Sequence, residues 1–245
     1  MLNYIKAELY KVRRRPAVWA GLPVLLLLEG IFLVLVRLSA SQEMTFGDMA
    51  YLLESMLLFG FVLLLSPANV VFSEQYKHRT LRNELEFGLP RRRIYLGKLI
   101  TSLLLACLTC LALLAVWLGG SMLLTGDLSG MDMLPRLTEL GHNLLLFLPL
   151  WLGALGLYHA LQFAVHSSAG AIMLYLGYFL IIEPFGIFLE EVGAGPLSLL
   201  VRQVSFSMAL TGENAGILRA WLVGLGWLVG STAAGLALFH RRDIP

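Results

Sequence analysis

Three carboxylates, Glu29, Glu54 and Glu183, stand inside long apolar stretches of this 245-residue chain. A charged group within a membrane span costs about 2.5–3.5 kcal/mol on insertion scales, so such residues are candidates for a transport pathway. Glu54 lies near one end of its stretch, and Glu183 precedes Pro184, where it can cap an interrupted helical turn. Glu29 lies in mid-stretch without such an explanation. All three are candidate pathway residues, and pairing across helices or protonation are the alternatives.

Patterns that would indicate an enzyme are missing from the sequence. It contains neither the G-x-S-x-G nucleophile motif nor the H-E-x-x-H zinc motif. Cys107 and Cys110 form a C-x-x-C pair inside an apolar stretch, where packing is the better interpretation. Gly97-Lys98 is not a nucleotide-binding P-loop, because Arg92 stands where the first glycine is required. We therefore predict no catalytic, metal or cofactor site in this chain.

The elements that hold these residues are membrane spans. Apolar residues make up 58% of the chain, compared with about 45–50% in soluble domains. They form blocks of the length needed to cross a bilayer, roughly 20 residues each. We predict one all-α polytopic domain, residues 1–245, with six transmembrane helices at about 17–38, 50–72, 96–124, 143–165, 169–189 and 217–240.

The basic residues predict how the chain lies in the membrane. Of its 18 Lys and Arg residues, 14 fall in the N-terminal segment, the second loop and the C-terminus if these share one side. The other side then holds four, namely Arg37, Arg136, Arg202 and Arg219. Since Lys and Arg are enriched in cytoplasmic loops, we predict that both termini are cytoplasmic.

The N-terminal segment 2–14 has the pattern of an amphipathic helix that lies along the membrane surface. Its apolar residues recur at helical spacing, at Leu2, Ile5, Leu9 and Val12. Pro16 then ends or bends the helix. We predict an elbow helix on the cytoplasmic face.

The second loop, residues 73–95, is the longest cytoplasmic stretch. Its sequence predicts a further helix from Glu74 to Phe87. Leu81 and Leu85 stack one turn apart in it, Gly88 is a suitable stop, and Pro90 prevents continuation. Anionic lipid head groups favour nearby basic residues by about 1 kcal/mol each. The residues predicted to contact them are Arg13, Arg14, Arg15, Arg92, Arg93 and Lys98.

The segment from 183 to 216, on the outer side, carries two further predictions. Pro184 is expected to end the fifth span early, and outer-leaflet interfacial helices are expected between it and the last span. In that last span, the Gly226-x-x-x-Gly230 pair allows close helix approach. We favour packing within the chain over a subunit interface for this pair.

The second loop resembles the first cytoplasmic loop of type-two (ABC-2) ABC transporter permeases, a class that includes the lantibiotic-immunity permeases. The resemblance extends to the rest of the chain, with the elbow, the six spans and the elaborated outer segment. It departs at Pro90, where Ser is more usual. The residues that carry the resemblance are Glu74, Thr80, Leu81, Arg82, Asn83, Gly88, Arg91, Ile94, Tyr95 and Lys98.

The resemblance implies a permease of the bacterial cytoplasmic membrane whose coupling helix, 74–87, is seated in a separate ATP-binding subunit. Two copies of that subunit would bind ATP and Mg²⁺, and a second permease chain would complete a homo- or heterodimer. The cargo would be an amphipathic antimicrobial peptide, lipid or drug, and nucleic acid is not expected. The implied coupling residues are Glu74, Thr80, Leu81, Arg82, Asn83, Leu85, Gly88 and Arg91.

Two other functions are compatible with such a membrane protein. A proton- or ion-coupled secondary transporter would use the intramembrane glutamates, although the two halves show no convincing repeat. A membrane scaffold or immunity protein would bind a peptide through its outer segment without transporting it.

Overall fold

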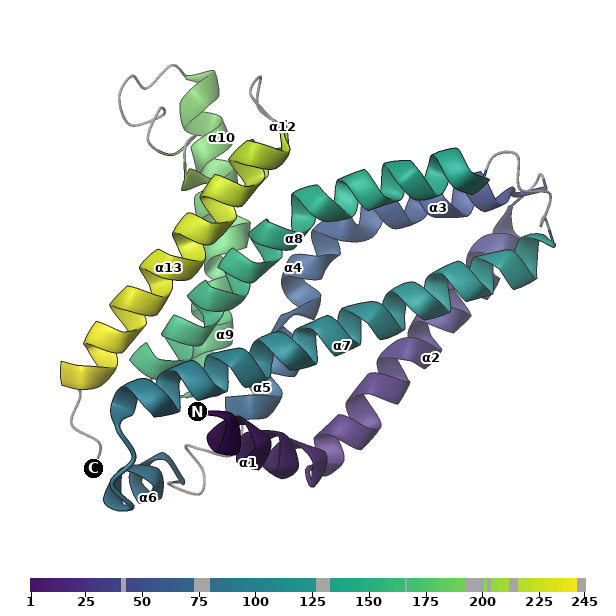
Figure 1. Cartoon of the computed structure of the whole chain (residues 1–245). Helices are drawn as coiled ribbons and strands as arrows, with labels where there is room; N and C mark the ends of the chain where they lie inside the picture. The colour runs from purple at the N-terminus through teal and green to yellow at the C-terminus, as the bar shows by residue number, and fades with distance from the viewer. Residues whose placement is uncertain are drawn as a thin grey trace.

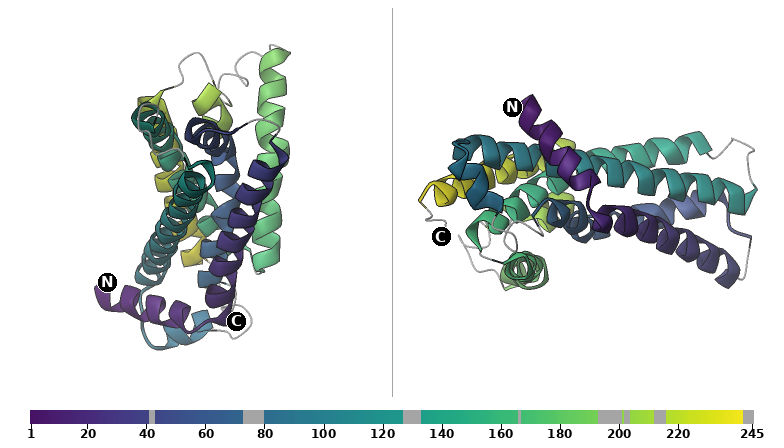
Figure 2. Two further views of the ribbon diagram at one scale, coloured as in Figure 1. Left: turned by 90° about the vertical axis from the view of Figure 1, so that its right-hand side faces the viewer. Right: turned by 90° about the horizontal axis from the view of Figure 1, so that it is seen from below.

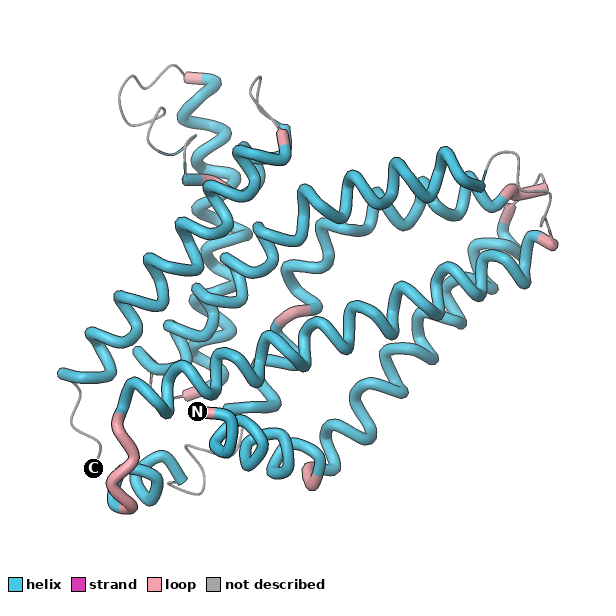
Figure 3. The backbone as a smooth tube through the Cα atoms, viewed as in Figure 1, coloured by secondary structure: helices cyan, strands magenta, loops and turns pink. Residues whose placement is uncertain are grey.

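The computed structural model describes residues 1–40, 43–72, 80–126, 133–165, 167–192, 201, 204–211 and 216–241. Its described elements are all helical, as Figure 3 shows. They are α1 (Leu2–Arg13), α2 (Pro16–Ser39), α3 (Phe46–Met56), η1 (Leu57–Phe59), α4 (Gly60–Leu63), α5 (Leu65–Phe72), α6 (Thr80–Glu86), α7 (Arg91–Thr125), α8 (Met133–Ala164), α9 (Ser168–Gly177), η2 (Tyr178–Ile182), α10 (Glu183–Glu191), α12 (Phe206–Thr211) and α13 (Ile217–Arg241).

The chain is an all-α polytopic membrane protein. Within the described residues, five helices are long and apolar enough to cross a membrane: Ala20–Ser39, Phe46–Phe72, Arg91–Thr125, Met133–Ala164 and Ile217–Arg241. Helices suit this environment because they satisfy every backbone hydrogen bond internally. The predicted span 169–189 falls on a shorter apolar helix, Ser168–Ile182, followed by α10. A count of six spans therefore stays a prediction.

The helices run back and forth between two ends of the molecule. In Figure 1, α2, α7 and the α9–α10 run lead away from the end that holds α1 and α6, and α8 and α13 lead back. The two turned views of Figure 2 agree that α1 lies across this end. We call it the α1–α6 end. The end of α13, at Arg241, lies there too, so the first and last described residues are on the same side of the helix bundle (Figure 1).

Helices α8 and α13 pack most closely, through small residues on facing surfaces. Gly153 lies against the backbone of Gly224, and Gly156 lies against Ser231. By contrast, a methyl group added at Gly226 or Gly230 would meet no atom of another element within 4 Å. The prediction that this pair serves internal packing was wrong. Positions two residues apart on an α-helix are rotated by about 200° around its axis. Gly226 therefore faces away from the surface that Gly224 presents to α8.

The expectation that Pro184 ends its helix was also wrong. The helical run continues from η2 into α10 and reaches Glu191. Proline is tolerated in the first turn of an α-helix, and Pro184 is the second residue of α10. The π-helical turn before it, Tyr178–Ile182, has already replaced the ordinary bonding pattern at this point.

Helix α12 belongs to the segment where outer helices were expected. It packs on α13, where Phe206 stacks on Trp227 with ring centroids 5.4 Å apart. The Trp227 indole Nε1 donates a hydrogen bond of 2.6 Å to the Val204 carbonyl oxygen. Both α10 and α12 lie at the end opposite α1 and α6 (Figure 1).

Candidate functional site

Helix α6 is short and has a sharply defined end. The predicted helix 74–87 overlaps it, although Glu74 lies outside the described residues. Gly88 adopts a φ of +77°, which a residue with a side chain rarely adopts. The Gly88 N–H donates to the Leu85 carbonyl (2.9 Å) and the Leu89 N–H to the Glu84 carbonyl (3.3 Å), which together form a Schellman motif. Pro90 then caps α7, so the turn between α6 and α7 is fixed at both ends.

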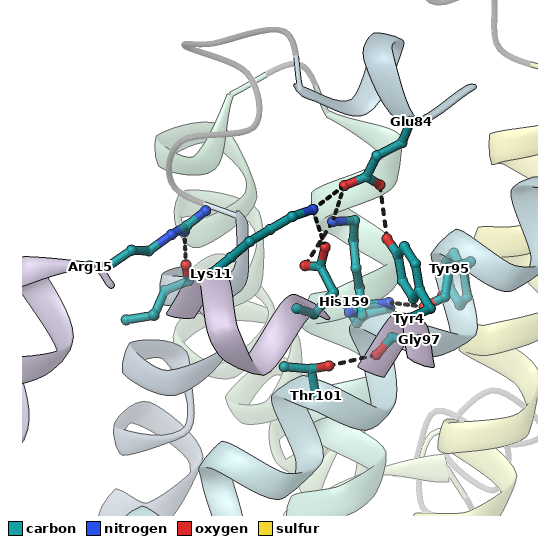
Figure 4. A network of polar contacts seen from close by, with 11 residues as sticks. Tyr4, Lys11, Arg15, Glu84, Tyr95, Gly97, Thr101 and His159 are labelled. Carbon is teal, nitrogen blue, oxygen red and sulfur yellow. Dashed lines mark hydrogen bonds and ion pairs between the residues drawn. The ribbon is translucent and has the colours of Figure 1, made fainter. Parts of the chain in front are cut away.

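Four charged side chains tie α6 to α1 and α7 (Figure 4). Lys98 Nζ of α7 lies 3.1 Å from Glu8 Oε2 of α1 and 3.5 Å from Glu84 Oε1 of α6. Lys11 Nζ of α1 lies 2.6 Å from Glu8 Oε1 and 2.8 Å from Glu84 Oε1. We call Glu8, Lys11, Glu84 and Lys98 the clamp. Each lysine bridges both carboxylates, so none of the three helices can move independently without breaking an ion pair.

The clamp is largely withdrawn from solvent. The side chains of Lys98, Glu8 and Glu84 are 1%, 3% and 10% exposed, whereas Lys11 is 45% exposed. Burial would raise the pKa of Glu8, but the charges of Lys98 and Lys11 and their hydrogen bonds outweigh it and lower that pKa. Burial would lower the pKa of Lys11, but its bonds to the two carboxylates raise it. Two positive and two negative groups leave the cluster electrically neutral.

Tyr4 joins the clamp from the side of α1. Its hydroxyl donates a hydrogen bond of 2.8 Å to Glu84 Oε2, and Lys98 Nζ lies 5.9 Å from the centre of its ring. Burial, together with the nearby carboxylates, raises the pKa of Tyr4, so the hydroxyl keeps the proton that it donates. The ring rests on Gly97, where any side chain would collide with it. Gly97 therefore leaves space for the Tyr4 ring, and Lys98 places a positive charge beside that ring.

Beneath the clamp, α7 is held to its neighbours by further polar contacts (Figure 4). His159 Nε2 of α8 donates to the Tyr95 carbonyl oxygen at 3.1 Å, because a carbonyl oxygen can only accept. Within α7 itself, Thr101 Oγ1 donates to the Gly97 carbonyl at 2.8 Å. At the start of α7, Arg91 donates to the Phe239 carbonyl and, at 3.2 Å, to the His240 carbonyl of α13. These bonds join the start of α7 to α8 and α13.

The clamp predicts a specific dependence of stability on pH. Because the pKa of Glu8 is lowered, its stabilising effect is complete above its ordinary pKa, about 4.3, and is lost as the pH falls through the folded-state pKa. We expect the free energy of unfolding to fall on acidification from about pH 5 to pH 3. The Glu8→Gln variant should lose less stability over that range. Equal losses in the two proteins, measured by denaturant titration in one detergent, would contradict this assignment.

Two of the predicted coupling residues face inward. Leu81 is 7% exposed and belongs to an apolar cluster with Tyr4, Phe72 and Tyr95. Leu85 packs against the same cluster. Arg82 and Asn83 are exposed, and Arg82 Nε pairs with Glu86 Oε1 at 2.8 Å. Thr80 begins α6. Both leucines therefore pack α6 against the membrane domain, and their role in coupling stays a prediction.

The large apolar side chain that does face outward is Phe87, which directly follows α6. It is 86% exposed, between the exposed Glu86 and Gly88. The sequence pattern places Phe87 at the end of the helix but assigns it no role. The sequence signal for an exposed apolar side chain was a phenylalanine in a polar loop, directly before the glycine that ends the helix.

The basic residues divide into surface and buried groups. Arg13, Arg14, Arg92 and Arg93 are exposed. Arg14 contacts Tyr10, with a hydrogen bond of 2.8 Å, and Arg15 donates to the Val70 carbonyl of α5 (Figure 4). Lys98, expected at the membrane surface, lies instead inside the protein. The reason is its position about two turns inside α7, where Glu8 and Glu84 converge on it.

The intramembrane carboxylates do not form one site. Glu29 of α2 and Glu54 of α3 each keep one buried oxygen without a hydrogen-bond partner, Oε2 and Oε1 respectively. Glu29 lines a cavity and Glu54 does not. The side chain of Glu183 lies outside the described part of α10. Among the described residues, no three His, Cys, Asp or Glu side chains are grouped as a metal site would require.

A bundle of spanning helices, with a short polar helix bonded to two others at one end, defines the architecture of a polytopic membrane protein. Comparison with protein families gives its class. The chain belongs to the ABC-2 family of transporter proteins, whose family model matches residues 4–182. That range includes the whole clamp. Comparisons with curated proteins and with solved structures gave no match.

The family defines the coarse function. This chain is a transmembrane subunit of an ABC transporter, and the family implies a partner subunit that binds ATP. The resemblance of the second loop to ABC-2 permeases is thereby confirmed at the level of the family.

Proposed function

We propose that this chain is the permease of an ATP-driven exporter in a bacterial cytoplasmic membrane, and that α6 receives force from the ATP-binding subunit. The observation that carries the proposal is the clamp. A helix that only connected two spans would need no buried ion pairs to its neighbours, because such pairs are costly to desolvate. Bonded through Glu84 to both α1 and α7, α6 can move only together with the membrane domain.

Coupling requires an outward face on α6 as well as an inward one. Arg82, Asn83 and Glu86 form a polar border beside the exposed Phe87. Protein interfaces commonly place an aromatic side chain at the centre and polar residues at the rim. This supports α6 as the part that is seated in the ATP-binding subunit.

The rest of the assembly follows from the same proposal. The α1–α6 end is cytoplasmic, which places both termini and the surface arginines of α1 and α7 beside anionic head groups. Six spans enclose little space, so a second permease chain and two ATP-binding subunits complete the transporter. The cargo is amphipathic, such as an antimicrobial peptide, a lipid or a drug, and resistance to such a peptide is the associated phenotype.

The energy source tests this function. Inside-out vesicles that contain the chain and its ATP-binding subunit should take up a dye-labelled amphipathic antimicrobial peptide when ATP is added. Uptake should persist when a protonophore collapses the proton gradient at constant ATP. It should stop when the P-loop lysine of the partner is replaced. Uptake that the protonophore abolishes would contradict the proposal and favour a proton-coupled transporter.

A further inference from the structure

A cavity of about 450 Å³ lies among α2, α3–α5, α7 and α8, within the apolar part of the bundle. Three of its lining residues, Leu28, Phe59 and Leu63, are 56%, 62% and 38% exposed on the outer surface of the chain. All three belong to helices long and apolar enough to cross a membrane, so an opening of the cavity beside them would face the bilayer. Its volume falls in the range of sites that hold drug-sized molecules, about 300–1,000 Å³.

Glu29 gives this apolar cavity a charge. Its Oε2 is buried and has no hydrogen-bond partner. None of the described residues that line the cavity is Lys, Arg or His. A buried carboxylate needs a cation or a hydrogen-bond donor. The walls offer donors at Thr109 and at Trp151, whose Nε1 is itself buried without a partner, but they offer no cation. A positively charged occupant would therefore find its counter-ion in Glu29.

Aromatic side chains complete the walls. Phe32, one turn along α2 from Glu29, lies 6.1 Å from Trp117 between ring centroids, and both rings line the cavity. The indole Nε1 of Trp117 already donates to the Met49 carbonyl at 3.0 Å, which fixes its ring. Aromatic faces attract organic cations, most strongly where water is excluded. The same wall that offers a carboxylate thus also offers surfaces for an apolar cation.

We propose that this cavity binds a lipophilic organic monocation, with Glu29 as its counter-ion and Phe32 and Trp117 as its aromatic walls. The molecule enters from the bilayer between the exposed side chains of α2 and α4. This proposal refines the proposed function. It depends on that function only for the statement that the bound molecule is transported. It names that cargo as a cation with a compact apolar body.

The test uses the full-length chain in nanodiscs of zwitterionic lipid, without ATP or a partner subunit. The probe is radiolabelled tetraphenylphosphonium, measured by equilibrium dialysis with empty nanodiscs as background. We expect saturable binding that weakens at least about tenfold in Glu29→Gln. Triphenylphosphine oxide, which is aromatic and uncharged, should compete far more weakly than unlabelled tetraphenylphosphonium.

Two variants separate the site from general effects. Glu54→Gln removes the other intramembrane carboxylate that has an unpartnered oxygen and lies outside the cavity, so it should bind the probe as the parent does. Leu113→Trp fills the cavity without changing its charge and should also weaken binding. Thermal unfolding midpoints should show that all variants are folded.

Equal binding to the parent and Glu29→Gln, or equal competition by triphenylphosphine oxide and unlabelled tetraphenylphosphonium, would overturn the proposal and favour a cavity filled by lipid chains. No saturable binding by the folded parent would overturn it as well. Because the assay contains no ATP, each of these results leaves the vesicle test of ATP-driven transport standing. Failure in vesicles with intact probe binding would count against the proposed function alone.

Discussion

Replacing Lys98 by methionine should lower the free energy of unfolding by about 3–5 kcal/mol, the usual cost of removing one partner from a buried ion pair. Lys98 is 1% exposed and bonds to two carboxylates. Methionine is nearly as long, and it leaves Lys11, which is half exposed to solvent, as the remaining cation of the clamp for Glu8 and Glu84. One buried negative charge then has no compensation. Unfolding of the purified chain in a fixed detergent with a rising SDS fraction measures the loss.

Two control variants make this prediction specific. Lys11→Met removes the same charge from a side chain that is 45% exposed, so it should cost only about 1 kcal/mol. The double variant Glu8→Gln with Lys98→Met removes one charge of each sign and should recover part of the stability lost in the single variant. A double variant that is no more stable than Lys98→Met would show that lost packing, rather than an unpaired carboxylate, causes the loss.

The second large effect is expected on assembly rather than folding. Phe87→Ala should weaken capture of the ATP-binding subunit by about 2 kcal/mol or more, roughly 30-fold, as expected for an aromatic residue at the centre of an interface. Its side chain is 86% exposed, so truncation removes almost no contact within the chain. Binding is measured with purified permease in nanodiscs and graded concentrations of the partner subunit.

The matched control for assembly is Phe188→Ala. Phe188 is also exposed, at 54%, but lies on α10 at the opposite end of the molecule. It should leave capture unchanged. Leu85→Arg is a poorer test, because Leu85 packs into the cluster around Leu81 and a charge there would disturb the fold. Undiminished capture by Phe87→Ala, in protein that inserts normally, would rule out the proposed seat of α6.

Local patterns in the sequence were enough to predict the helices of the membrane domain. Apolar blocks of spanning length, the amphipathic repeat of residues 2–14 and the glycine stop at Gly88 depend on neighbours along the chain. The corresponding elements are the five long apolar helices among the described residues, α1 and the left-handed turn after α6. These features are visible without knowing which helices touch.

What could not be predicted depends on helix packing. The contact between Glu8 and Lys98 joins residues 90 positions apart, and the sequence alone does not say that α1 crosses the start of α7. For the same reason Leu81 was expected to face a partner, although it faces the cluster around Tyr95. Phe87 was missed because exposure is a property of the folded chain. The faces of Gly224 and Gly226 likewise become distinct only when α8 is in place.

The distance in sequence between Glu8 and Lys98 also bears on biogenesis. When Glu8 is translated, its counter-ion Lys98 is still 90 residues from being translated. Until then, α1 can rest only on the head groups, held by its amphipathic surface and its arginines. Helix α1 is synthesised first, but it can form its ion pair with α7 only after the start of α7 has been made. Correct docking of α1 thus marks a nascent chain whose later helices have inserted in the right order.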